Sequence, residues 1–300
     1  MTVCVAALCE NGKALVMAAD KMVGMTYVEG EPDITKMRPL HKDWWVLFAG
    51  DHVAPAFDII DYAKAELNKL HKLSADQPAS LEAVKRSMQK GFEKKRLEEA
   101  EALYLKTIGW TLDRFNRDGY QVLPNSSQIQ SDIDRYRLHV QLLIAGFEDG
   151  DGLLFEIAGY GDKPGIPVRF DIPGFHAIGS GSTVAIFMMY YRGLSPRTSG
   201  RDAAYYSLEA KYYGEQASGV GLDSDLFLAK PGEDLITIGD ERIEECLIPI
   251  CKALSPREIR KADRKRLNEM AELKWFGPST EPPKKTKAGK AKNPAPDAND

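Results

Sequence analysis

The order of strand-like and helix-like segments in this 300-residue chain predicts an α+β fold, a four-layer αββα sandwich of two antiparallel sheets. Apolar segments with strand-like alternation form a first block, two helical regions follow, and a second block of strands, two more helices and two last strands complete the order. Tight turns between successive strands favour antiparallel pairing, and apolar helix faces have to be buried against the sheets. We therefore expect two sheets packed face to face, with helices on their outer faces.

The first block of strands begins with a hairpin close to the start of the chain. Residues 3–8 and 14–18 are apolar and alternate, and the ENGK stretch at 10–13 between them is a turn signal. A short extended piece is expected at 35–40. The WWVLFA run at 44–49 is typical of a buried strand.

Helical periodicity replaces this alternation in the next part of the chain. From Asp51 to Leu70, apolar residues recur at helical spacing. A second helical region is expected from Leu81 to about Phe115, and its charged centre is typical of a helix that faces solvent or a partner. The segment 119–134 is expected to be a loop.

The second half of the chain again has strands followed by helices, all of ordinary length. The expected strands are 139–147, 153–158, 175–178, 226–229 and 235–238, and the expected helices are 183–191, 201–215 and 255–275. We expect one folded domain over 2–250 with an enlarged helical region at 81–137, and a C-terminal helix within 251–277. Residues 278–300 are rich in proline, lysine and small polar residues, a composition that predicts a disordered tail.

Composition and charge exclude several classes of function. The net charge of −4 gives no support for nucleic acid as a partner, and no apolar run is long enough to predict a membrane span. The five histidines are scattered without ligand spacing, so we expect no metal site. The four cysteines form no C-x-x-C pair and are expected to be small buried side chains in a reducing compartment. These observations favour the cytoplasm.

Thr2 is the first candidate catalytic residue. A threonine with a free amine carries both a nucleophilic hydroxyl and a base that titrates near neutral pH. This chemistry requires removal of Met1, and a strand that begins at the next residue would hold Thr2 rigidly. Taken alone, a threonine after the first methionine is common and carries no function.

Three further residues and two short stretches each have an ordinary and a catalytic interpretation. Asp20 is either a solvated turn carboxylate or the partner of a lysine, and Lys36 is either a surface lysine or a charge that tunes a nucleophile. Gly50 is either a helix-entry turn or an oxyanion donor. The GSGS stretch at 179–182 and the EQASGVG stretch at 215–221 are either tight turns with helix caps or parts of a site.

Taken in order, these positions resemble the proteasome β-type subunits and their bacterial relatives, the ClpQ/HslV-like and Anbu-like peptidases, which are N-terminal-nucleophile hydrolases. The resemblance covers about residues 2–240. It implies the N-terminal-nucleophile hydrolase fold and catalytic roles for Thr2, Asp20, Lys36, Gly50, Ser180, Glu215 and Ser218. Glu215 stands where the family usually has an aspartate in a D-x-x-S-G pattern, because this chain reads E-Q-A-S-G.

The resemblance also assigns roles. Thr2 would be the nucleophile after removal of Met1, with Asp20 and Lys36 as its charge partners. Gly50 would supply the oxyanion N–H, and two serines would hydrogen-bond the Thr2 amine and its water. No cofactor is expected.

Substrate preference and assembly follow from the same resemblance. Val23, Ile34, Phe48 and His52 would surround the substrate, and Phe48 shares a strand face with Gly50. This lining predicts cleavage after small or medium apolar residues. The expected protein is a threonine endopeptidase subunit of a homo-oligomeric ring or spiral that acts on peptides or unfolded proteins. An ATPase unfoldase is a further partner that the resemblance suggests. The alternatives are an amidase of the same fold that acts on a small amide, and a non-catalytic ring or scaffold subunit.

Overall fold

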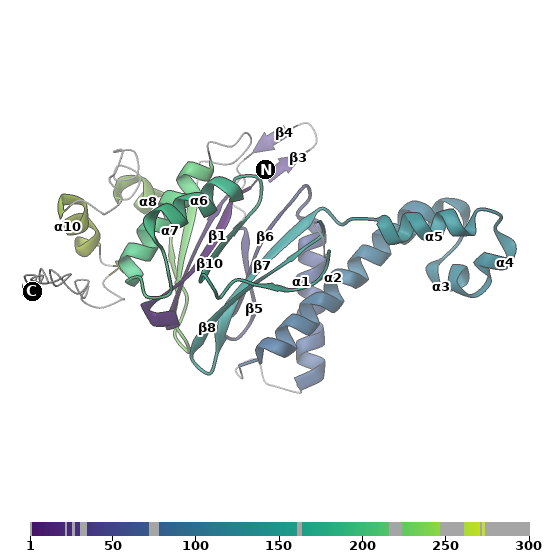
Figure 1. The fold of residues 1–300 in the computed structure, drawn as a ribbon, viewed down its shortest axis with the longest axis horizontal. Helices are drawn as coiled ribbons and strands as arrows, with labels where there is room; N and C mark the ends of the chain where they lie inside the picture. The colour runs from purple at the N-terminus through teal and green to yellow at the C-terminus, as the bar shows by residue number, and fades with distance from the viewer. Residues whose placement is uncertain are drawn as a thin grey trace, which may run out of the picture.

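Two five-stranded antiparallel sheets form the centre of the computed structural model (Figure 1). The structure describes residues 2–21, 23–25, 28–30, 35–71, 78–160, 164–215, 224–246, 261–270 and 272–273. The prediction of an α+β chain with two antiparallel sheets is confirmed for these residues.

The first sheet is built around the N-terminal hairpin and has the order β10-β1-β2-β11-β12. Its strands are β1 Cys4–Cys9, β2 Ala14–Asp20, β10 Phe175–Ile178, β11 Ser224–Ala229 and β12 Ile236–Ile238. The turn between β1 and β2 is the short 3-10 helix η1, Glu10–Gly12, in which all three residues have positive φ. Cys4 pairs with Ala19 on one side and with Ile178 on the other, so the start of β1 lies between the end of β2 and the end of β10.

The second sheet has the order β5-β6-β7-β8-β9, and each strand follows its neighbour in the chain. Its strands are β5 Met37–His41, β6 Trp44–Gly50, β7 Val140–Glu148, β8 Asp151–Ala158 and β9 Val168–Arg169. Gly50 is the last residue of β6 and pairs with Val140, the first residue of β7. A separate pair, β3 Val23–Met25 and β4 Val28–Gly30, lies outside both sheets.

The sheets face each other across a buried apolar layer. The first sheet contributes mainly small side chains from β1 and the second contributes larger ones from β6 and β7, and strand alternation sends every second residue into this layer. Its members include Cys4, Ala6, Leu8, Leu15, Met17, Trp45, Leu47, Ala49, Leu143 and Phe147. Because buried apolar side chains pack closely, this layer fixes the position of one sheet relative to the other.

Helices cover the outer face of each sheet (Figure 1). Helices α6 Ser182–Arg192 and α7 Gly200–Gly214 pack on β1, β2 and β11. Helices α1 Ala54–His71 and α2 Leu81–Tyr104 pack on β6 and β7. The resulting order of layers agrees with the predicted sandwich.

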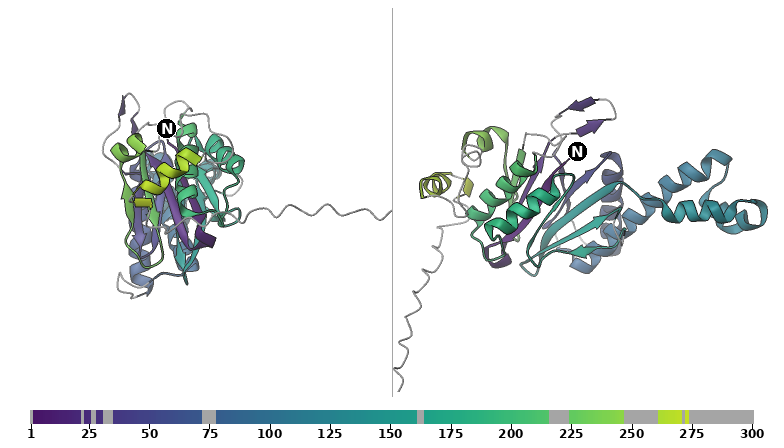
Figure 2. Two further views of the ribbon diagram at one scale, coloured as in Figure 1. Left: turned by 90° about the vertical axis from the view of Figure 1, so that its left-hand side faces the viewer. Right: turned by 45° about the horizontal axis from the view of Figure 1, so that its top comes forward.

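The distal part of α2 and the segment that follows it form an arm that projects away from the sheets (Figure 2). Its elements are η2 Lys106–Ile108, α3 Leu112–Arg114, the π-helix η3 Phe115–Gly119, α4 Tyr120–Val122 and α5 Ser126–Arg135. The prediction of a loop at 119–134 is therefore wrong. The physical reason is a small core of the arm itself, in which Ile129 and Ile133, one helical turn apart, pack against Phe115.

The described part of the C-terminal region lies against α7. Helix α8 spans Asp240–Cys246 and α10 spans Lys261–Glu269, within the predicted helix at 255–275. Arg264 pairs with Asp202 of α7 at 2.8 Å, and Leu267, Met270 and Leu273 join the core on that side. Residues 251–260 and the predicted tail at 278–300 lie outside the described residues. In the part of the chain that the structure describes, no helix combines the length and the apolar character needed to cross a membrane.

Candidate active site

Thr2 lies two residues before the start of β1 and is held by backbone contacts on both sides. Val3 N donates to Asp20 Oδ1 at 2.9 Å, and Gly181 N donates to the Thr2 carbonyl oxygen at 3.4 Å. Gly179 has φ +92°, and a Cβ at that position would collide with the Thr2 carbonyl oxygen. Only glycine fits this close approach without strain. The turn after β10 is thus shaped around Thr2.

A buried lysine joins Thr2 to a carboxylate. Lys36 Nζ donates to Thr2 Oγ1 at 2.5 Å and to Asp20 Oδ2 at 2.9 Å. The exposed fractions of Thr2, Lys36 and Asp20 are 5%, 3% and 0%. Charges buried to this degree are tolerated only when they are paired. A cation at this distance would stabilise negative charge that develops on the Thr2 hydroxyl oxygen.

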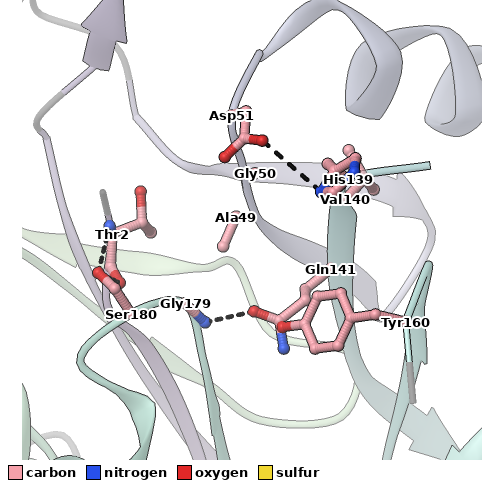
Figure 3. A pocket seen from close by; sticks show the side chains of 10 residues that line it. All are labelled: Thr2, Ala49, Gly50, Asp51, His139, Val140, Gln141, Tyr160, Gly179 and Ser180. Atoms are coloured by element: carbon pink, nitrogen blue, oxygen red, sulfur yellow. Dashed lines mark hydrogen bonds and ion pairs between the residues drawn. The ribbon is translucent and has the colours of Figure 1, made fainter. Parts of the chain in front are cut away.

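Ser180 contacts the main chain of Thr2. Thr2 N donates to Ser180 Oγ at 3.3 Å, and Ser180 Oγ donates to the Thr2 carbonyl oxygen at 3.4 Å (Figure 3). Ser180 belongs to the turn between β10 and α6, so both contacts follow from the pairing of β10 with β1. The structure therefore brings together Thr2, Asp20, Lys36 and Ser180, as the sequence predicted.

A pocket of about 210 Å³ opens beside Thr2. Its lining residues are Thr2, Ala49, Gly50, Asp51, His139, Val140, Gln141, Tyr160, Gly179 and Ser180 (Figure 3). Gly50 is exposed and lies across the pocket from Ser180. The predicted oxyanion residue and the predicted nucleophile thus border the same space.

The side of the pocket away from Thr2 is polar. Asp51 Oδ2 lies 3.7 Å from His139 Nδ1, and both side chains are exposed. Burial, together with the nearby Glu156 carboxylate, raises the pKa of Tyr160 to about 12, so its hydroxyl stays a neutral donor. Sequence reasoning missed these residues, and only the pairing of β6 with β7 brings residues 139–141 next to Gly50.

Glu215 lies at the end of α7 and is paired with a lysine. Lys211 Nζ donates to the Glu215 carboxylate and, at 2.5 Å, to Ser224 Oγ. Ser224 is the cross-strand partner of Asp20, so this buried pair lies next to the Asp20–Lys36 pair in the sheet. Among the described contacts, Thr2 makes none with Glu215. The catalytic role predicted for Glu215 stays a prediction.

Of the predicted substrate-binding residues, Phe48 and His52 have described side chains, and neither is among the described lining residues of this pocket. Phe48 is 2% exposed and its ring packs edge-on against Phe57, with centroids 5.3 Å apart. The prediction that Phe48 lines the pocket is wrong, because strand alternation turns it toward α1 and presents Ala49 instead. His52 is exposed and is not among the described lining residues.

Three of the predicted site residues have side chains outside the part of the chain that the structure describes. Val23 lies in β3, but its side chain is outside the described set. Ile34 and Ser218 lie outside the described residues. Their predicted roles remain predictions.

The described residues contain no group of three or more histidine, cysteine, aspartate or glutamate side chains placed to hold a metal ion. Cys4 and Cys9 are buried, and burial raises the pKa of both thiols. The Cys4 thiol donates to the Phe48 carbonyl oxygen at 3.6 Å. Thiols in such surroundings stay protonated and are poor nucleophiles.

Neither a scan against protein-family models nor a search of curated proteins finds a match for this chain. Its function therefore has to be inferred from the chemistry of the side chains around Thr2. The Thr2 hydroxyl contacts the buried Lys36 ammonium group, and Ser180 accepts a hydrogen bond from the Thr2 main-chain nitrogen. Gly50 lies at the opposite wall of the same pocket.

Proposed function

We propose that this chain is a threonine-type endopeptidase subunit in which Thr2 is the nucleophile after removal of Met1. The observation that carries the proposal is the buried Lys36 ammonium group, which lies between Thr2 Oγ1 and Asp20. Lys211 is also buried beside a carboxylate and a hydroxyl, but the hydroxyl partner of Lys36 belongs to Thr2, which lines the pocket. Next to a hydroxyl, the positive charge of Lys36 stabilises the ionised form of that hydroxyl, which is the nucleophilic form.

The proposed reaction begins with proton transfer from the Thr2 hydroxyl to the free Thr2 amine. Oγ1 then attacks the substrate carbonyl carbon, and the Lys36 ammonium favours the developing alkoxide. Ser180 accepts from the Thr2 nitrogen and so fixes the direction of the amine. The protonated amine returns its proton to the leaving nitrogen, which departs as a free amine.

The remaining steps stabilise the oxyanion, form an ester intermediate and hydrolyse it. Gly50, at the end of β6, would donate its N–H to the negative oxygen of the tetrahedral intermediate. Collapse of that intermediate leaves an ester on Thr2 Oγ1. The Thr2 amine then takes a proton from water while the water oxygen attacks the ester carbonyl carbon. The bond from that carbon to Oγ1 breaks, and the amine returns the proton to Oγ1, which frees the acid and restores the Thr2 hydroxyl.

The proposal extends to fold family and assembly. The helix-covered pair of sheets and the order of the site residues support assignment to the N-terminal-nucleophile hydrolases, with the proteasome β-type subunits as the group that the sequence resembles. Subunits of that group work in closed or spiral homo-oligomers. We accordingly propose a homo-oligomeric ring or spiral acting on peptides or unfolded protein, with an ATPase unfoldase as a possible partner.

The size of the pocket supports a second candidate, an amidase that acts on a small amide. A space of about 210 Å³ with a polar side would hold one small ligand. The same Thr2 chemistry would apply. A non-catalytic scaffold subunit is disfavoured, because the hydroxyl that contacts the buried Lys36 belongs to a residue that lines an open pocket.

The test combines the mass of the mature chain with substitutions of Thr2. We expect an intact mass that lacks Met1, hydrolysis of fluorogenic peptides, loss of this activity in Thr2→Ala and retention of part of it in Thr2→Ser. Thr107→Ala, an exposed threonine of the arm, is the matched control and should keep full activity. Full activity of Thr2→Ala, or of protein that retains Met1, would contradict the mechanism. Activity on small amides alone would favour the second candidate.

A further inference from the structure

Gln141 connects the second sheet to the turn that holds Thr2. Gly179 N donates to Gln141 Oε1 at 2.6 Å (Figure 3). Gln141 Nε2 donates to Glu156 Oε1 at 2.9 Å. Gln141 and Glu156 lie on the neighbouring strands β7 and β8, whereas Gly179 follows β10 of the first sheet. One side-chain amide thus bridges the two sheets at the pocket.

The orientation of this amide is determined by its second partner. An ionised carboxylate only accepts hydrogen bonds, so Glu156 requires the NH₂ end of Gln141. The carbonyl end is then left for Gly179 N, which only donates. The two partners therefore specify one of the two possible orientations.

Glu156 is held in turn by the first sheet. His176 Nε2 lies 3.0 Å from Glu156 Oε2, and the His176 ring stacks on Phe170 with centroids 3.5 Å apart and planes 9° from parallel. His176 lies on β10, three residues before Gly179. The chain of contacts from β10 through Glu156 and Gln141 therefore returns to the end of the same strand.

Movement of this turn would be transmitted to the Thr2 nitrogen. Gly179 lies against the Thr2 carbonyl oxygen, and the next residue, Ser180, accepts from Thr2 N. We propose that Gln141 is a positioning residue for the Thr2 amine, which it controls through Gly179 and Ser180, and that Glu156 orients it. This inference rests on the proposed function, in which that amine is the general base.

The first test replaces Gln141 by methionine, which keeps the length of the side chain and removes both hydrogen bonds. Its matched control is Gln128→Met, because Gln128 is exposed on α5 and bonds only to Asp132 among the described contacts. We expect kcat to fall about tenfold in Gln141→Met, with KM within about threefold of wild type, since misplacement of a catalytic base slows the chemical step. The control should match wild type.

A second readout follows the amine itself and needs no peptidase activity. Protein that begins at Thr2 is labelled with a trace of acetic anhydride across a range of pH, and labelling of the N-terminal peptide is measured by mass spectrometry. Ser180 Oγ stabilises the protonated amine by accepting from it, so its displacement lowers the pKa of the amine. We expect the midpoint of labelling to move to lower pH by about half a pH unit in Gln141→Met, which is the effect of losing one hydrogen bond.

The role of Glu156 is tested by a double-mutant cycle. Glu156→Gln leaves an amide that can present either end to Gln141, so we expect a smaller loss of kcat than in Gln141→Met. If Glu156 acts through Gln141, the double variant should match Gln141→Met alone. Additive losses would overturn the orienting role.

The outcomes separate this inference from the proposed function. If wild type hydrolyses peptides and Gln141→Met matches it in kcat and in the labelling midpoint, the inference is wrong and the function stands. If KM rises while kcat and the midpoint do not change, Gln141 contacts substrate and positions nothing, which also refutes it. If no substrate is hydrolysed but the midpoint moves as expected, the positioning role stands and the proposed function fails.

Discussion

Substitution of Lys36 by methionine tests whether the buried charge serves catalysis or only the fold. The change keeps most of the aliphatic stem and removes the ammonium group, so Asp20, with 0% exposure, loses a salt-bridge partner at 2.9 Å. Breaking a buried ion pair in this way costs about 3–5 kcal/mol of unfolding free energy. A loss of activity in this variant alone would therefore be ambiguous.

The double variant Asp20→Asn, Lys36→Met removes the ambiguity. It contains neither charge, and asparagine Oδ1 can still accept from Val3 N, as Asp20 Oδ1 does at 2.9 Å. Removing both members of a buried pair is often close to neutral for stability. We expect it to recover most of the stability that Lys36→Met loses. Activity should not return, because loss of one group that stabilises developing negative charge costs about 10²–10³ in kcat.

The measurements are urea unfolding and kcat with a fluorogenic peptide on the wild type, both variants and a control. Lys95→Met is the matched control, since Lys95 pairs with Asp58 at 2.6 Å on the surface between α1 and α2. We expect it to lose about 1 kcal/mol or less and to keep full activity. If the double variant is stable and keeps more than a tenth of wild-type kcat, Lys36 is structural and the proposed mechanism is wrong.

Three further substitutions have defined outcomes. Gly179→Ala should abolish peptide hydrolysis and lower the melting temperature, because a Cβ would collide with the Thr2 carbonyl oxygen; normal activity would contradict the close approach. Phe48→Ala should destabilise the protein by about 3–5 kcal/mol in urea unfolding, as expected for a buried aromatic side chain. The substrate preference of this variant in a fluorogenic panel should not change. A broader preference would show that Phe48 does line the substrate pocket. Phe115→Ala should increase hydrogen exchange within the arm but not in the sheets, because its core is separate.

Much of the fold follows from local patterns in the sequence. Alternation and the ENGK turn specify the first hairpin, and the WWVLFA run specifies β6, because these segments bury side chains on a regular period. The last helix of the arm, α5, was missed for a physical reason. The SSQIQSDIDR segment of α5 is polar except at Ile129 and Ile133, and it folds as a helix around a core supplied by residues up to 33 positions away, such as Ala100.

The same distinction between local patterns and tertiary packing applies to the residues of the candidate site. Thr2, Asp20, Lys36 and Gly50 stand at the ends of elements whose boundaries the sequence marks, so they could be identified. The partner of Glu215 could also have been seen, because Lys211 precedes it by four residues on one helix. Tyr160, His139 and Gln141 depend on strand register and on the packing of one sheet against the other, which no local pattern encodes.

The residues of the candidate site come from both sheets. Thr2 and Asp20 are carried by the first sheet, whereas Lys36 and Gly50 adjoin strands of the second. The hydrogen bond from Lys36 to Thr2 therefore spans the apolar layer between the sheets, and its length depends on how closely that layer packs. Small side chains at Cys4 and Ala6 face this layer and allow the close approach. Since packed interiors transmit volume changes, a larger residue at Ala6 would separate Lys36 from Thr2 without touching either.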